Sequence, residues 1–154
     1  MSQIRNLCIL PQNQAQDARF QVQAIAATPR VPMGRSPVVA VVDDDPAVCS
    51  SLKFSLELEG FVVRLYGNAT EFLNAGDSQS CDCVVVDQRM PGLSGMELIA
   101  KLRALEVRTP AILLISQPNA AVAARAAKAA VPIVEKPLLG NALLDRLREA
   151  CGRN

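Results

Sequence analysis

Residues 84–95 have the sequence VVVDQRMPGLSG, in which three valines lead directly into Asp87. The following Met-Pro-Gly predicts a turn, and apolar residues recur at helical spacing after Ser94. This pattern predicts a buried strand that ends in a carboxylate, then a loop, then a helix. Open α/β sheets bind ligands in the crevice outside the carboxyl ends of their strands. Asp87 is therefore a candidate site residue, and its partners are expected at the ends of other strands.

The chain from Pro37 onward alternates between two kinds of segment. Short apolar runs predict strands at 38–43, 61–66, 83–87, 111–116 and 131–135. Segments between and after them predict helices at about 46–59, 68–75, 94–106, 118–130 and 140–151. Regular alternation favours a parallel sheet covered on both faces. We expect an α/β fold with a flavodoxin-like, doubly wound, five-stranded parallel sheet of order 2-1-3-4-5 and five helices.

Local signals support several of these helices. Pro46 suits a first helical turn, and Asn68 with Glu71 has the spacing of a capping box. Apolar residues recur at helical spacing in three helices. In the first, most of them are expected on one face: Val48, Leu52, Leu56 and Leu58. The third has Met96, Leu98, Ile99 and Leu102, and in the last Leu143, Leu144 and Leu147 are expected to face inward.

The first 36 residues differ from the rest in composition. They contain six glutamines, four arginines against one aspartate, and no convincing periodicity. We expect 1–36 to be a flexible N-terminal extension and 37–154 to form one domain. Met33 stands just before the first predicted strand, so two alternatives stay open: translation starts there, or the extension belongs to the protein.

Composition excludes several functions. The formal net charge of +1 gives no reason to expect direct nucleic-acid or membrane-surface binding. No apolar run approaches the roughly 18 residues of a membrane helix, and no signal pattern opens the chain, so we expect a cytoplasmic protein. The chain has no histidine, which excludes Ser-His-Asp and Cys-His catalysis. Its five cysteines are expected to be reduced and to act as small apolar residues.

Polar residues follow four of the five predicted strands. Asp43-Asp44-Asp45 follow the first, Asp87 ends the third, Ser116 ends the fourth, and Glu135-Lys136-Pro137 close the fifth. Taken singly, each has an ordinary explanation as a helix cap or a solvated residue. Together they are expected to converge at one edge of the sheet. Carboxylates about 4 Å apart repel by roughly 4 kcal/mol at an effective dielectric of 20, so the set needs a cation or a proton. Oxygen ligands favour Mg²⁺.

Residues 38–151 resemble the response-regulator receiver domains of bacterial two-component signalling. The segments that carry the resemblance are VVDDDP, VVVDQRMPGLSG, LLIS and VEKPL, in this order. The loop after Asp87 is similar to that of receivers of the nitrogen-fixation and luminescence-regulator type.

The resemblance implies a Mg²⁺-dependent phosphoryl site. Asp87 matches the phosphoacceptor, which attacks the phosphorus of a phosphohistidine on a partner. Asp43 and Asp44 match the acidic pair that holds Mg²⁺, with Asp87 and the backbone carbonyl of Arg89 as further ligands.

Three more positions match the family. Lys136 matches the lysine that pairs with a phosphoryl oxygen, and Pro137 the proline that follows it, typically in a cis peptide. Ser116 matches the switch residue that hydrogen-bonds the phosphoryl group.

The resemblance also implies partners. A sensor histidine kinase or a phosphotransfer protein is expected to supply the phosphoryl group. Because the chain stops at Asn154, we expect a stand-alone regulator that contacts a downstream protein through residues 118–130, 131–135 and 140–151. Such a protein is not an enzyme for other substrates; it catalyses only its own phosphorylation and dephosphorylation.

Other features depart from the family. Ile133 stands where an aromatic switch residue is usual, and the 116–136 stretch is about two residues shorter than usual. These departures favour the alternative of a degenerate receiver that only binds partners. A truncated transcription factor is a third possibility. A haloacid-dehalogenase-like phosphatase is disfavoured because Gln88-Arg89, not an Asp-x-Asp motif, follows Asp87.

The residues after Ser116 predict a long-lived phosphorylated state. Gln117 narrows access to Asp87, and Pro118 has no N–H with which to position an attacking water. We therefore expect slow self-dephosphorylation, measured as the decay of labelled aspartyl phosphate in the isolated protein. A half-life of only seconds would contradict this expectation.

Overall fold

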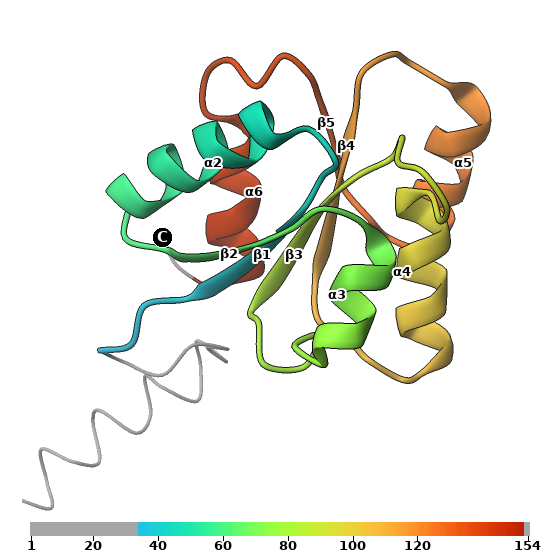
Figure 1. Cartoon of the computed structure of the whole chain (residues 1–154). Helices are drawn as coiled ribbons and strands as arrows, with labels where there is room; N and C mark the ends of the chain where they lie inside the picture. The colour runs from blue at the N-terminus through green and yellow to red at the C-terminus, as the bar shows by residue number, and fades with distance from the viewer. Residues whose placement is uncertain (1–33, 153–154) are drawn as a thin grey trace, which may run out of the picture. The chain divides into compact units, whose positions relative to one another are not determined.

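The computed structural model describes residues 34–152, which form one parallel five-stranded sheet and five helices (Figure 1). The elements in chain order are β1 (Val38–Val42), α2 (Pro46–Leu58), β2 (Val62–Tyr66), α3 (Ala69–Ala75), β3 (Cys83–Asp87), α4 (Gly95–Ala104), β4 (Ala111–Ile115), α5 (Ala120–Lys128), β5 (Ile133–Glu135) and α6 (Ala142–Ala150). The strand order is β2-β1-β3-β4-β5. The predicted fold class and topology are confirmed.

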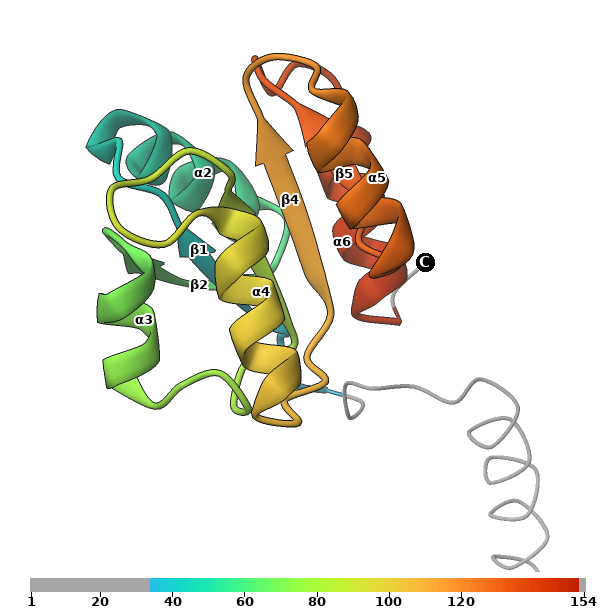
Figure 2. The same cartoon turned by 90° about the vertical axis from the view of Figure 1, so that its right-hand side faces the viewer.

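Helices cover both faces of the sheet. Figures 1 and 2 show α2 and α6 on one face and α3, α4 and α5 on the other. The buried residues form two clusters that correspond to these two layers. Every residue of β1, β3 and β4 is buried, which explains why these strands are almost uniformly apolar.

Polar side chains fix where the helices begin. Asp45 accepts hydrogen bonds from two amides at the start of α2. Ser94 and Glu97 form a complete capping box at α4. The capping box predicted at Asn68 is half formed: Asn68 accepts from the Glu71 amide at 2.8 Å, but the Glu71 carboxylate accepts from the amide of Gly67 instead.

The last strand is shorter than predicted. Residues 129–131 close α5 rather than begin a strand, because Ala130 has a φ of 58° and the amide of Val131 bonds back to the carbonyl of Ala126 at 2.8 Å. The strand therefore starts at Ile133. The preceding strand, β4, ends at Ile115, so Ser116 lies one residue beyond it.

Leu58 is the exception among the four apolar residues expected mostly on one face of α2. Its exposed fraction is 71%, whereas Cys49, Leu52 and Leu56 form the buried stripe of α2. Leu58 lies two positions after Leu56, which places it about 200° around the helix from that stripe. The four apolar residues named in 94–106 are all buried. In α6, Leu143 and Leu147 are buried and Leu144 is partly buried.

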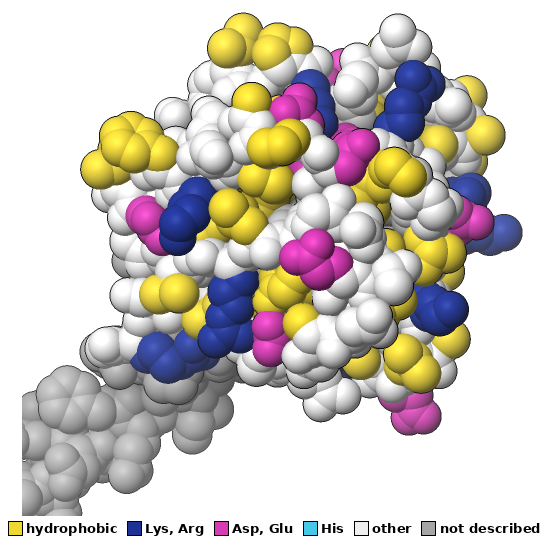
Figure 3. Space-filling view, in the orientation of Figure 1, with side chains coloured by type: hydrophobic (Ala, Val, Ile, Leu, Met, Phe, Trp, Pro, Cys, Tyr) yellow, Lys and Arg dark blue, Asp and Glu magenta, His cyan; other side chains and the backbone are white. Residues whose placement is uncertain are grey.

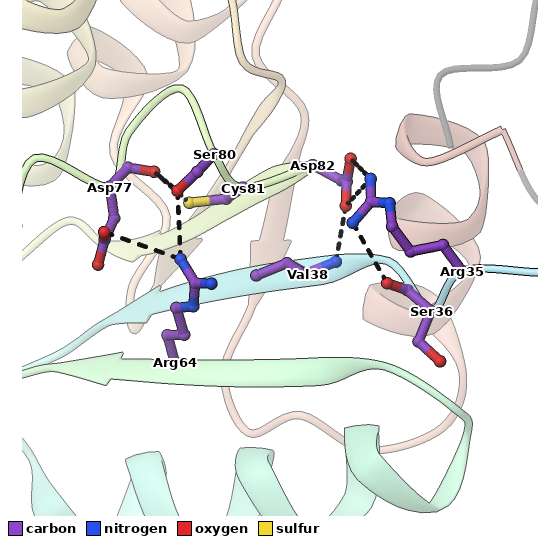
Figure 4. Close-up of polar contacts among 8 residues, drawn as sticks. All are labelled: Arg35, Ser36, Val38, Arg64, Asp77, Ser80, Cys81 and Asp82. Atoms are coloured by element: carbon purple, nitrogen blue, oxygen red, sulfur yellow. Dashed lines mark hydrogen bonds and ion pairs between the residues drawn. The ribbon is translucent and has the colours of Figure 1, made fainter. Parts of the chain in front are cut away.

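Asp77 and Asp82 form the polar contacts that hold the loop before β3 and the segment before β1 (Figure 4). Asp82 forms an ion pair with Arg35 at 2.9 Å and accepts a hydrogen bond from the amide of Val38 at 2.7 Å. Asp77 lies 3.8 Å from Arg64, and its carbonyl accepts hydrogen bonds from the side chains that follow it in the loop. Arg35 thus contacts the domain, while residues 1–33 of the predicted extension lie outside the described part.

One face of the described residues, drawn in Figure 3, has mixed chemical character. On the face drawn in Figure 3, hydrophobic, basic and acidic side chains are interspersed. No helix within residues 34–152 has the length and hydrophobicity needed to cross a bilayer.

Gly95 lets α4 approach the end of β3. A Cβ atom built there would lie 2.7 Å from the carbonyl oxygen of Asp87 and 2.6 Å from a methyl carbon of Leu113. Because one of these neighbours is backbone, the contact cannot be relieved by a side-chain rotation. A residue without a side chain is required here for packing.

We expect Gly95→Ala to lower the free energy of unfolding by about 1–3 kcal/mol, the usual cost of overpacking. Urea unfolding measures this. The matched control is Gly67→Ala, where the nearest atom to the new Cβ is the flexible end of Glu71 at 3.3 Å. Equal stability of the two variants would contradict the close approach.

Candidate functional site

The carboxyl ends of β1 and β3 bring three carboxylates together. One oxygen each from Asp43, Asp44 and Asp87 lies within 4.8 Å of the others. Asp43 and Asp87 are buried, with exposed fractions of 1% and 4%, whereas Asp44 is exposed. This convergence follows from the parallel pairing of β1 with β3, which places both strand ends at the same edge.

Lys136 joins the two buried carboxylates. Its Nζ lies 3.0 Å from Oδ2 of Asp43 and 3.0 Å from Oδ1 of Asp87. Lys136 comes directly after β5, and its own amide donates to the carbonyl of Ile115 at 2.7 Å. The end of β4 therefore holds the lysine where it reaches across the sheet edge.

Charge explains why the lysine is needed. At a separation of 4.8 Å or less, two carboxylates repel by roughly 3 kcal/mol or more at an effective dielectric of about 20. Each ion pair of Lys136 at 3.0 Å offsets this with about 5 kcal/mol of attraction on the same scale. One ammonium group brings a single positive charge to three carboxylates, so the cluster keeps a net charge of −2 when all three are ionised.

The charged surroundings shift the pKa values of both Asp87 and Lys136. Burial raises the pKa of Asp87, and the neighbouring Asp43 and Asp44 raise it further against the opposing effect of Lys136. For Lys136, burial acts to lower the pKa, but its contacts with Asp43 and Asp87 outweigh burial and raise it. Lys136 is thus a cation at neutral pH, and the surroundings of Asp87 disfavour its ionised form.

The backbone around Asp43 is tightly fixed. Oδ1 of Asp43 accepts a hydrogen bond from the amide of Asp45 at 3.0 Å, and its carbonyl accepts one from the thiol of Cys49 at 3.2 Å. Asp45 in turn caps α2. Of the Asp triplet, Asp43 and Asp44 therefore belong to the carboxylate cluster, and Asp45 caps α2.

Asp87 retains an unused acceptor. Its Oδ1 is the one buried side-chain oxygen or nitrogen within residues 34–152 that has no hydrogen-bond donor, because its contact with Lys136 is an ion pair without hydrogen-bond geometry. A buried carboxylate oxygen whose partner is a single ammonium group, beside two more carboxylates, fits a hard divalent cation such as Mg²⁺. The residues present are therefore compatible with the predicted metal.

Ser116 and Arg89 are more exposed than Asp43 and Asp87. Both are exposed, and both line a recess of about 300 Å³ between the loop after β3 and the loop after β4. Gln88 and Gln117 line the same recess. The roles of Ser116 as a switch and of the Arg89 carbonyl as a metal ligand stay predictions.

Two further predicted positions are located by the structure. The Lys136–Pro137 peptide is cis, as the resemblance implies. Ile133 is partly buried and packs against the core cluster on the side of α3, α4 and α5.

Two residues near the site were given no role from the sequence. The side chain of Gln88 accepts a hydrogen bond from the amide of Met96 at 2.9 Å, and Cys49 bonds to Asp43 as described above. The position of Gln88, a polar residue directly after a buried strand, was the sequence signal that could have indicated its role. No sequence pattern distinguishes Cys49 from an ordinary buried cysteine.

Comparison with known proteins gives a consistent result. Residues 39–148 match the response regulator receiver domain family. The chain is 37% identical over 123 residues to the transcriptional regulatory protein FixJ of Azorhizobium caulinodans, an alignment that covers 79% of this chain and 58% of that protein. The chain spans about half the length of the curated relatives it matches.

Solved structures agree with the sequence matches. The crystal structure of FixJ-N is 30% identical, with a TM-score of 0.66, and the match covers 77% of this chain and 94% of that one. The structure of the response regulator StyR is 34% identical, with a TM-score of 0.70 and coverage of 76% and 60%.

We expect Asp87→Asn to stabilise the protein at pH 7 in the presence of a chelator, by an amount on the order of 1 kcal/mol. Asp87 holds its proton more tightly in the folded than in the unfolded state. Stability is therefore lost as the pH rises from the unfolded pKa of about 3.9 through the raised folded pKa, and the variant avoids this loss.

Urea unfolding at pH 7 and at pH 3 tests this expectation, because the difference between variant and wild type should shrink at the lower pH. Asp145→Asn is the control, since Asp145 is exposed and lies on α6. A destabilised Asp87→Asn at pH 7 would be the contrary result.

Proposed function

We propose, on the premise that the chain belongs to the response regulator receiver domain family, that Asp87 accepts a phosphoryl group from a histidine kinase or a phosphotransfer protein. The observation that carries this proposal is the pairing of buried Asp87 with Lys136 beside Asp43 and Asp44. A buried carboxylate with an unused oxygen is a suitable nucleophile, and the lysine is a suitable partner for the incoming negative charge.

In the proposed reaction, a carboxylate oxygen of Asp87 attacks the phosphorus of a phosphohistidine. A phosphorus–oxygen bond forms, the phosphorus–nitrogen bond breaks, and the imidazole leaves with the bonding electrons and takes up a proton. The product is an aspartyl phosphate. Lys136 keeps its charge throughout and pairs with a phosphoryl oxygen, which costs little reorganisation because its Nζ already lies 3.0 Å from Asp87.

Asp43, Asp44 and Asp87 are proposed to hold Mg²⁺, with the carbonyl of Arg89 as a further ligand. When bound, the ion neutralises negative charge on the phosphoryl oxygens. Asp43 is well suited to this role because its carboxylate is already oriented by the amide of Asp45 and by Lys136. Ser116 is proposed to bind the phosphoryl group from the other side of the site.

The proposed output is a contact with another protein through α5, β5 and α6, in a protein acting in the cytoplasm. The receiver is proposed neither to act on other substrates nor to bind nucleic acid or membranes directly. Ile133 favours a second candidate, a degenerate receiver that binds partners without phosphorylation, because an aliphatic side chain stands at the position of the usual aromatic.

Phosphorylation tests the proposal directly. The wild-type protein is incubated with Mg²⁺ and either labelled acetyl phosphate or a phosphorylated histidine kinase. We expect an acid-stable, base-labile label that Asp87→Asn abolishes and that a chelator prevents. Asp145→Asn is the matched control and should be labelled like the wild type. Absence of label from both donors would refute the proposal and leave the second candidate.

A further inference from the structure

Gln88 binds the first two amides of α4. Its backbone carbonyl accepts a hydrogen bond from the amide of Gly95 at 3.1 Å, and its side-chain Oε1 accepts one from the amide of Met96 at 2.9 Å. The first amides of a helix have no partner within the helix itself. Ser94 supplies a partner for the amide of Glu97 at 3.2 Å, so Gln88 and Ser94 together satisfy the first turn.

The same residue is joined to the phosphoacceptor strand. Gln88 directly follows Asp87, and its amide donates to the carbonyl of Leu114 at 2.9 Å. This bond extends the pairing of β3 with β4 one residue beyond the end of β3. Gln88 therefore links three parts of the molecule: the backbone of Asp87, the end of β4 and the start of α4.

There is little free space at this junction. A Cβ atom at Gly95 would lie 2.7 Å from the carbonyl oxygen of Asp87 and 3.0 Å from the Cα of Gln88. The next residue, Met96, is buried. Because packed elements move as units rather than deform, a displacement at Asp87 is passed to the first turn of α4.

A route from Asp87 through the predicted switch positions Ser116 and Ile133 has fewer contacts. Within the described residues, the side chain of Ser116 forms no hydrogen bond, and it is exposed. Ile133 offers no hydroxyl or aromatic ring on β5. By contrast, Gly95 at the start of α4 lies directly against the backbone of Asp87.

We propose that Gln88 is a positioning residue that couples Asp87 to the first turn of α4, so that phosphorylation of Asp87 displaces this turn. This inference rests on the proposed function of Asp87. It adds the first turn of α4 to the elements that respond to the state of Asp87.

The test follows backbone amides by NMR with and without Mg²⁺ and beryllofluoride, a phosphoryl analogue. In the wild type, the amides of Gly95, Met96 and Glu97 are expected to shift when the analogue binds. In Gln88→Met, which keeps the length of the side chain but removes the acceptor, the shifts of these amides should be lost. The shift of Lys136 and the labelling of Asp87 should persist.

Gln117→Met is the matched control, because Gln117 lines the same recess and forms no hydrogen bond with the described residues. It should respond like the wild type. Gln88→Glu keeps an acceptor for the amide of Met96 and should restore the response. If Gln88→Met does not fold, Gln88→Asn replaces it, since its shorter side chain cannot reach Met96 from the same backbone position.

Persistence of the α4 shifts in Gln88→Met would overturn the coupling, and so would their loss in Gln117→Met. Loss of labelling in Gln88→Met would also overturn it, since Gln88 would then act in the chemistry. A wild type that is not labelled refutes the proposed function itself, which separates the two failures.

Discussion

The two contacts of Lys136 with Asp43 and Asp87 are the interaction on which the site depends. They join residues at the ends of β1, β3 and β5, and Asp43 and Lys136 lie 93 positions apart in the chain. Without the lysine, two buried carboxylates would face each other with no cation. The parallel sheet makes the contact possible, because it places all strand ends at one edge.

A second constraint surrounds Asp87 on the side of α4. Gly95 allows the helix to touch the backbone of Asp87, and Gln88 binds the first amides of that helix. The candidate nucleophile is thus held by charge on one side and by backbone packing on the other. A site fixed in both ways needs little rearrangement before phosphoryl transfer, which is the condition for electrostatic catalysis.

The fold and the centre of the site could be predicted because their signals are strong. Valine-rich strands buried on both faces, and carboxylates directly after them, specify the sheet and the acidic edge. The start of β5 could not be predicted, since the left-handed backbone of Ala130 depends on how α5 closes. The exposure of Leu58 follows from the helical spacing, because a residue two positions after Leu56 lies on the opposite side of α2. The role of Gln88 was missed because it depends on a tertiary contact with the amide of Met96.

The central claim is that Asp43, Asp44 and Asp87 form one site for a divalent cation. Calorimetric titration with MgCl₂ tests it most directly, with Asp145→Asn as the control. The wild type and the control are predicted to bind Mg²⁺ equally, whereas Asp43→Asn and Asp87→Asn should each lose affinity by about tenfold or more. Unchanged Mg²⁺ affinity in both site variants would contradict the claim.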